Sequence, residues 1–171
     1  MGVALLASGL GSAMAATITT TSGVVGGALT LTASGTASLS ATLTGLDVVA
    51  TGSLGAATVV DATGTGTGWN LTITGTTFSA TGGRTLPSDA LTITGVTVVK
   101  NAGKVPVNAV SYPTTIPLGT SAPTPVKFFS AATDSGMGKF TITPTVSLAI
   151  PAEAYVGDYS STITVSVVSG P

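Results

Sequence analysis

Strict alternation of apolar and polar residues is the feature that most constrains how this chain can fold. Residues 69–74 read WNLTIT, which places Trp69, Leu71 and Ile73 on one face of an extended strand. A second alternating segment covers residues 159–168, and Tyr159 begins its apolar face. We expect the two segments to share a core. The predicted core residues are Trp69, Leu71, Ile73, Ile163, Val165 and Val167.

Similar short runs recur along the chain between turns that are rich in glycine and proline. We expect further strands at residues 29–32, 37–43, 58–60, 91–99 and 140–148. Gly95 predicts a bulge, and Pro144 predicts an edge position or a kink. Because no segment shows a helical period, we predict an all-β fold, an antiparallel β-sandwich of the Ig-like, Greek-key type with about seven to nine strands.

The composition fits such a domain and excludes several classes of function. The chain has 171 residues, of which 43% are hydrophobic and only 6% are charged, and its net charge is −1. We therefore expect one folded domain and no nucleic-acid partner, because no basic patch is present to neutralise phosphates. The absence of cysteine and histidine excludes disulfides, thiolate or imidazole metal sites, and nucleophiles that depend on histidine.

The acidic residues give little support for catalysis. The chain has six of them, and they are scattered. The closest pair in sequence, Glu153 and Asp158, is expected at the entry to a strand. We predict no catalytic residue, no cofactor and no metal. Calcium at a turn that contains Asp61, Asp134 or Asp158 is the alternative, although the spacing of a calcium loop is absent.

The first residues resemble a secretion signal. An apolar stretch runs from Val3 to Leu10, and Ala13-Met14-Ala15 has the small residues of a cleavage site. We therefore expect a signal at residues 1–15, a mature domain at residues 16–171 and secretion to the cell surface or cell wall. The alternative is a buried strand or helix. The segment is too short to remain as a membrane span, and we expect no transmembrane segment in the mature chain.

Residues 100–132 differ from the rest of the chain because they contain five prolines. We interpret this segment as a long connection across the sandwich, which either packs or binds. Residues 126–129, Val-Lys-Phe-Phe, are expected to form a short strand or an apolar plug within it.

Trp69 has two interpretations. It is either a core anchor or an exposed aromatic platform for a sugar or a partner chain. The preceding GTGTG, residues 64–68, lacks the lysine of a phosphate loop and precedes a strand, so we expect a flexible turn. Asn70 begins a glycosylation sequon, which requires an exposed asparagine.

These residues, together with the end of the chain, resemble the WxL domain of Gram-positive cell-surface proteins. In that family an aspartate and a glycine-rich turn precede a Trp-x-Leu strand. Here Asp61 and the turn at residues 64–68 precede Trp-Asn-Leu at residues 69–71. Phe78, the Gly-x-x-Leu of residues 83–86, the Gly-x-Tyr of residues 157–159 and a terminal proline also fit. The second Trp-x-Leu is absent, because Val165-Ser166-Val167 stands in its place.

The resemblance implies a noncatalytic domain that attaches noncovalently to the cell wall. Its implied partners are peptidoglycan or other cell-surface proteins. The expected binding residues are Trp69, Asn70, Leu71 and Tyr159. If the family's two tryptophans are instead core residues, Val165 is a tolerable replacement.

Two other functions remain open. The chain could be a structural subunit that self-associates into an extracellular filament or surface layer, with residues 16–22 donated as a strand to a neighbour's open sheet edge. It could also be a carbohydrate-binding accessory to an enzyme.

Overall fold

The computed structural model describes residues 20–33 and 35–171, which form strands and connecting segments without a helix. The expected signal at residues 1–15 and the expected mature start at Ala16 lie outside the described residues. The strands are β1 (Leu29–Ala33), β2 (Val48–Ser53), β3 (Ala57–Asp61), β4 (Trp69–Thr76), β5 (Ser79–Ala80), β6 (Arg84–Thr85), β7 (Leu91–Gly103), β8 (Thr114–Thr115), β9 (Leu118–Gly119), β10 (Val126–Ala131), β11 (Gly138–Ile150) and β12 (Ile163–Ser169).

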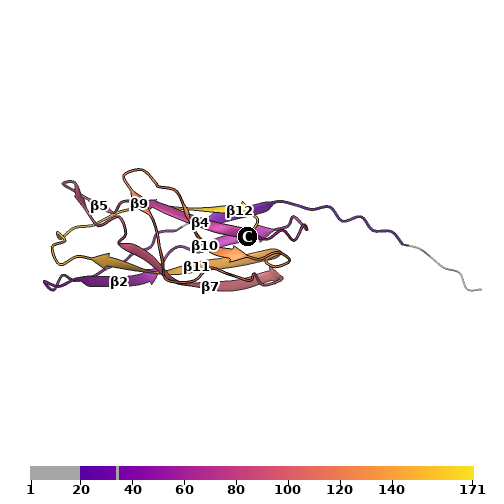
Figure 1. The fold of residues 1–171 in the computed structure, drawn as a ribbon, viewed down its shortest axis with the longest axis horizontal. Coiled ribbons are helices and arrows are strands. Elements are labelled where there is room, and N and C mark those ends of the chain that lie inside the picture. The colour runs from indigo at the N-terminus through magenta and orange to yellow at the C-terminus, as the bar shows by residue number, and fades with distance from the viewer. Residues whose placement is uncertain (1–19, 34) are drawn as a thin grey trace, which may run out of the picture.

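The strands form two main sheets that pack face to face. The larger sheet has the order β1-β3-β11-β7-β8, with β2 also paired to β11, and all of its pairs are antiparallel. The smaller sheet has the order β10-β4-β12, with the short β9 parallel to β4. Figure 1 shows the smaller sheet stacked above the larger one along the length of the molecule. The prediction of an all-β antiparallel sandwich is confirmed.

Pro144 lies in the middle of the central strand β11, so the predicted edge or kink is wrong. One side of β11 pairs with β3 through residues 138–142 and with β2 through residues 145–150. Pro144 falls between these two registers, and its carbonyl accepts a hydrogen bond from Leu54 N at 3.0 Å. Since the N–H and C=O of one strand residue point to the same side, the missing proline donor faces this junction, where no ladder bond is lost.

The bulge predicted at Gly95 is confirmed. Along β11, Thr145 pairs with Gly95 of β7, but the next residue, Val146, pairs with Ile93. Thr94 is therefore the extra residue of β7, directly before the glycine.

Residues 37–43 do not form the strand that their alternation predicts. Leu39 is half-buried and packs over β2, since a Cβ added to Gly52 would lie 2.6 Å from Leu39 Cδ2. The segment therefore crosses the inner face of β2 instead of running beside its edge, and residues 36–46 form no backbone hydrogen bond with any other described residue. An alternating sequence gives a strand only where an edge is available for pairing.

The proline-rich connection contributes to both sheets, because β8 pairs with β7 of the larger sheet, whereas β9 and β10 pair with β4 of the smaller one. Its final part, residues 126–131, is the strand β10, in which Phe128 and Phe129 are buried, so the strand interpretation of residues 126–129 is confirmed. Within the connection, the Tyr112 hydroxyl donates to the Phe128 carbonyl at 2.7 Å. Burial raises the pKa of Tyr112 above its usual value, and the hydrogen bond with Asn108 opposes this rise only in part.

Candidate functional site

One end of the sandwich is closed around Trp69. Its side chain has no exposed surface, its Nε1 donates to the Gly136 carbonyl at 2.9 Å, and its ring centroid lies 5.8 Å from that of Phe129. Leu71 is also fully buried, and Asn70 Nδ2 donates to the Gly170 carbonyl at 2.8 Å. A ring buried in this way offers no platform to a ligand, and an amide engaged beneath the surface is a poor glycosylation acceptor.

The glycine–threonine turn before Trp69 is held in place by hydrogen bonds, which corrects the expectation of a flexible turn. Asp61 Oδ1 accepts from both the amide and the hydroxyl of Thr63, at 3.0 and 2.7 Å. The Gly66 carbonyl accepts from Asp134 N at 2.8 Å. Gly68 has φ +75°, and a Cβ added there would meet the Ala131 carbonyl oxygen. The turn thus closes the end of the core, and only glycine fits at residue 68.

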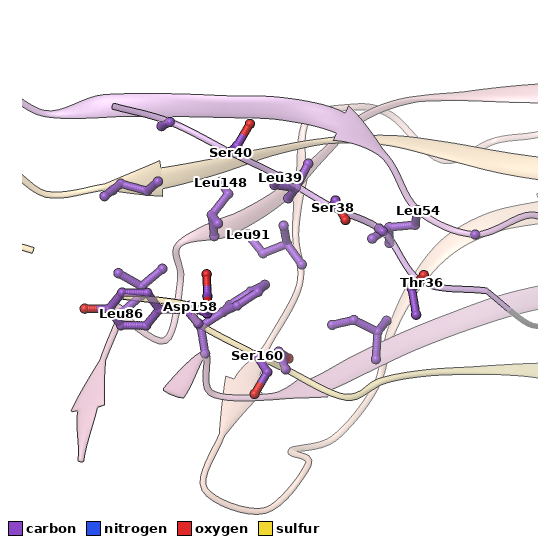
Figure 2. A pocket seen from close by; sticks show the side chains of 18 of the residues that line it. Thr36, Ser38, Leu39, Ser40, Leu54, Leu86, Leu91, Leu148, Asp158 and Ser160 are labelled. Carbon is purple, nitrogen blue, oxygen red and sulfur yellow. The ribbon is translucent and has the colours of Figure 1, made fainter. Parts of the chain in front are cut away.

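The opposite end of the sandwich contains a groove between the sheets, with a cavity volume of about 1360 Å³. Residues 35–43 form one wall and residues 155–161 form the other. Figure 2 shows Thr36, Ser38 and Leu39 along one side of the cavity and Asp158 and Ser160 along the other, with Leu91 and Leu148 between them. The groove therefore has an apolar floor and polar walls, as ligand-binding sites commonly have. Among the apolar residues at its floor, Leu54, Phe78 and Val165 are half-buried, whereas Leu91, Phe128 and Leu148 are buried.

A smaller cavity of about 400 Å³ adjoins the groove at Tyr155 and Tyr159, which line both. The Tyr159 hydroxyl donates to the Tyr155 carbonyl at 3.0 Å. The guanidinium carbon of Arg84 lies 3.2 Å from the centroid of the Tyr155 ring. Two tyrosines and an arginine thus meet at the mouth of the groove, where aromatic faces and N–H donors are available to a ligand.

The structure does not bring the four expected binding residues together. Trp69 begins β4 and pairs with Ser169, whereas Tyr159 precedes the start of β12, at the other end of this pair of strands. Tyr159 is half-buried and lies at the groove, while Trp69, Asn70 and Leu71 lie in the closed end. Of the four, only Tyr159 lies on a surface that a ligand can reach.

The expected core residues occupy two environments. Trp69, Leu71 and Ile73 are fully buried on the central strand of the smaller sheet. Those on β12 are half-buried and pack against the core, because β12 is an edge strand with β4 on one side only. These half-buried residues are Ile163, Val165 and Val167. Val165 pairs with Ile73 and also lines the groove.

Sequence reasoning missed Tyr155 and Arg84. Their only signals were the Gly-x-Tyr turn next to Tyr155 and the position of Arg84 as the single arginine of the chain, directly after two glycines. Among the described residues, no group of three or more potential metal ligands is found. Asp61, one of the three aspartates considered for calcium, is buried and accepts hydrogen bonds from Thr63.

A comparison with protein families decides where the protein works. A family model described as a WxL domain, surface cell wall-binding, matches residues 18–171. This chain belongs to the WxL family. The WxL match places the domain at the cell surface or cell wall and makes wall binding its general function. No curated protein and no solved structure matches the chain significantly. In the described part of the chain there is no helix that could span a membrane.

Proposed function

We propose that this WxL domain attaches noncovalently to the cell wall by binding peptidoglycan in the groove between its two sheets, without catalysing a reaction. The family match supports wall binding in general. The observation that favours the groove is its combination of a large cavity, an apolar floor and two tyrosines at the mouth. Peptidoglycan offers sugar rings and peptide groups, which suit aromatic faces and polar walls respectively.

The absence of tryptophan from the second motif is consistent with an open groove. The resemblance to the family puts Val165 where a second tryptophan would stand, and Val165 lines the cavity. A valine fills less of this space than an indole would. The protein that carries Val165 therefore keeps room for a ligand between β12 and the opposite sheet.

This position also gives the sharpest test of the proposal. Val165→Trp should fill the groove, and we expect the affinity for purified peptidoglycan sacculi to fall about tenfold or more, because the ligand then competes with a side chain for the same space. Val168→Trp is the matched control, since Val168 lies on the same strand with its side chain 49% exposed and is not among the groove residues. Binding is measured by co-sedimentation with sacculi across a range of protein concentrations.

Thermal unfolding of both variants distinguishes a filled groove from a damaged fold. If Val165→Trp overpacks the edge and unfolds, Tyr159→Ala replaces it as the test variant, because it removes a ring from the mouth of the groove. Unchanged sedimentation by a folded Val165→Trp protein would place the wall-binding surface elsewhere. A wild-type domain that does not sediment with sacculi would reject peptidoglycan as the ligand.

A further inference from the structure

Arg84 and Tyr155 form an exposed stacked pair that joins two loops. The Tyr155 side chain is 59% exposed, and Arg84 is exposed on a two-stranded hairpin. Their close approach is 3.2 Å from guanidinium carbon to ring centroid. A flat guanidinium on a tyrosine keeps its N–H groups at the edge of the stack, where they can reach a second group.

The two loops that carry this pair are fastened to each other. The hairpin β5–β6 turns through Gly82 and Gly83, whose φ angles are +81° and +73°. Ser79 and Ser160 exchange two backbone hydrogen bonds, of 3.0 and 2.9 Å, between the hairpin and the loop that contains Tyr155. The arginine is thus presented at the mouth of the groove before a ligand arrives, which lowers the entropic cost of binding.

The Arg84 guanidinium is not neutralised by the protein. It stacks on the Tyr155 ring, and among the described residues no ion pair or hydrogen bond of the Arg84 side chain is found. Because Arg84 is exposed, its five N–H donors face water and remain available to a ligand. A planar anion with two oxygens, such as a carboxylate, fits them in a bidentate arrangement.

The other charges at this site restrict the kind of anion. Arg84 is the only cation among the described residues that line the two cavities, and Glu153 and Asp158 are the only anions there. A polyphosphate chain would meet two negative charges for one positive charge. A ligand with one carboxylate meets less repulsion than a polyphosphate, and an ammonium group beside the carboxylate reduces it further.

We infer that Arg84, stacked on Tyr155, binds a carboxylate in the peptide part of peptidoglycan. This inference rests on the proposed function, and it adds the chemical group that the site recognises. Arg84 and Tyr155 hold the carboxylate at the mouth, while the adjoining groove takes the rest of the ligand. Glu153 and Asp158 discriminate against anionic wall polymers that carry phosphate.

The test compares variants and chemically modified walls in the same sedimentation assay. Arg84→Gln should lower the affinity for sacculi about tenfold or more, since hydrogen bonds between charged groups are among the strongest in water. Arg84→Lys keeps the charge but loses the flat fork, and we expect an intermediate affinity. Lys139→Gln is the matched control, because it removes the same charge from an exposed residue that lines neither cavity.

Amidation of the sacculi carboxylates should weaken wild-type binding as strongly as Arg84→Gln does, and the variant should be insensitive to it. Removal of the phosphate-containing wall polymers should leave wild-type binding unchanged.

Binding that is equal for wild type and a folded Arg84→Gln protein would overturn the carboxylate site while leaving groove binding intact. Loss of binding after removal of the phosphate polymers alone would assign the anion to them instead. Wild-type protein that ignores sacculi altogether would reject the proposed function, and the inference with it.

Discussion

The two ends of the sandwich are built from the same sheets, but one is closed and the other is open. At the closed end, Trp69 is fully buried and the Gly66 and Gly68 carbonyls accept hydrogen bonds from Asp134 and Gly170. At the open end, residues 36–46 form no backbone hydrogen bond with any other described residue, and a cavity of about 1360 Å³ remains between the walls.

This difference places the residues that stabilise the fold at one end of β4 and β12 and the residues that a ligand can reach at the other. A fold is stabilised where apolar side chains are removed from water and buried polar groups form hydrogen bonds. Binding instead needs apolar and polar groups that a ligand can reach. We therefore expect substitutions at the closed end to change the free energy of unfolding, and substitutions at the open end to change affinity for the wall.

The largest expected effect on stability is that of Trp69→Ala. The change removes a buried ring and leaves a cavity beside Phe129, so it should lower the free energy of unfolding by about 3–5 kcal/mol. Urea denaturation followed by circular dichroism measures this loss, because the variant lacks the single tryptophan needed for fluorescence. Trp69→Phe is the control that keeps a ring but loses the hydrogen bond to the Gly136 carbonyl.

The comparison also requires that the folded fraction of the Trp69→Ala protein still binds sacculi with wild-type affinity. A loss of less than about 1 kcal/mol would show that the closed end does not hold the fold together. A Trp69→Ala protein with wild-type stability but no binding to sacculi would show that Trp69 belongs to the ligand site.

Gly136→Ala should have the next largest effect. Gly136 has φ +70°, and a Cβ there would lie 2.5 Å from Ala131 Cβ and 2.8 Å from Trp69 Nε1. The strained backbone and the collision together should cost about 2–4 kcal/mol. Gly64→Ala separates the two causes, because Gly64 has φ +69° with no atom within 4 Å of the added Cβ. Equal losses in the two variants would mean that contact with Trp69 contributes nothing.

The buried strand of the closed end is the part of the molecule that the sequence predicts best. The alternation of residues 69–74 required a strand with one buried face, and β4 covers Trp69–Thr76 with Trp69, Leu71 and Ile73 fully buried. Alternation is local information, so it can be read without knowing the partner strands. The bulge was predicted from Gly95 itself, which is also local information.

The open end depends on contacts between distant segments, and the sequence did not reveal it. Arg84 and Tyr155 are far apart in the chain, and backbone hydrogen bonds between Ser79 and Ser160 join the loops that carry them. Pro144 could not be placed at a junction without knowing that both β2 and β3 pair with β11. Residues 37–43 misled the prediction because alternation says which face is apolar but not whether an edge is free.

The smallest effect on stability is expected for Leu39→Ala, in the segment that forms one wall of the groove. Leu39 is half-buried and packs over Gly52, and its backbone has no ladder to lose. The free energy of unfolding should therefore fall by about 1 kcal/mol or less, well below the cost of removing a fully buried leucine.

Affinity for sacculi should nevertheless fall severalfold in the Leu39→Ala protein, because Leu39 lines the cavity. Thr44→Ala, at an exposed residue of the same segment that lines neither cavity, controls for a general disturbance of the segment. A loss of about 3 kcal/mol or more for Leu39→Ala would make residues 36–46 part of the core, since only a side chain that the folded state fully buries costs that much to remove. The groove end would then contribute to stability as the Trp69 end does, and the separation between the two ends would fail.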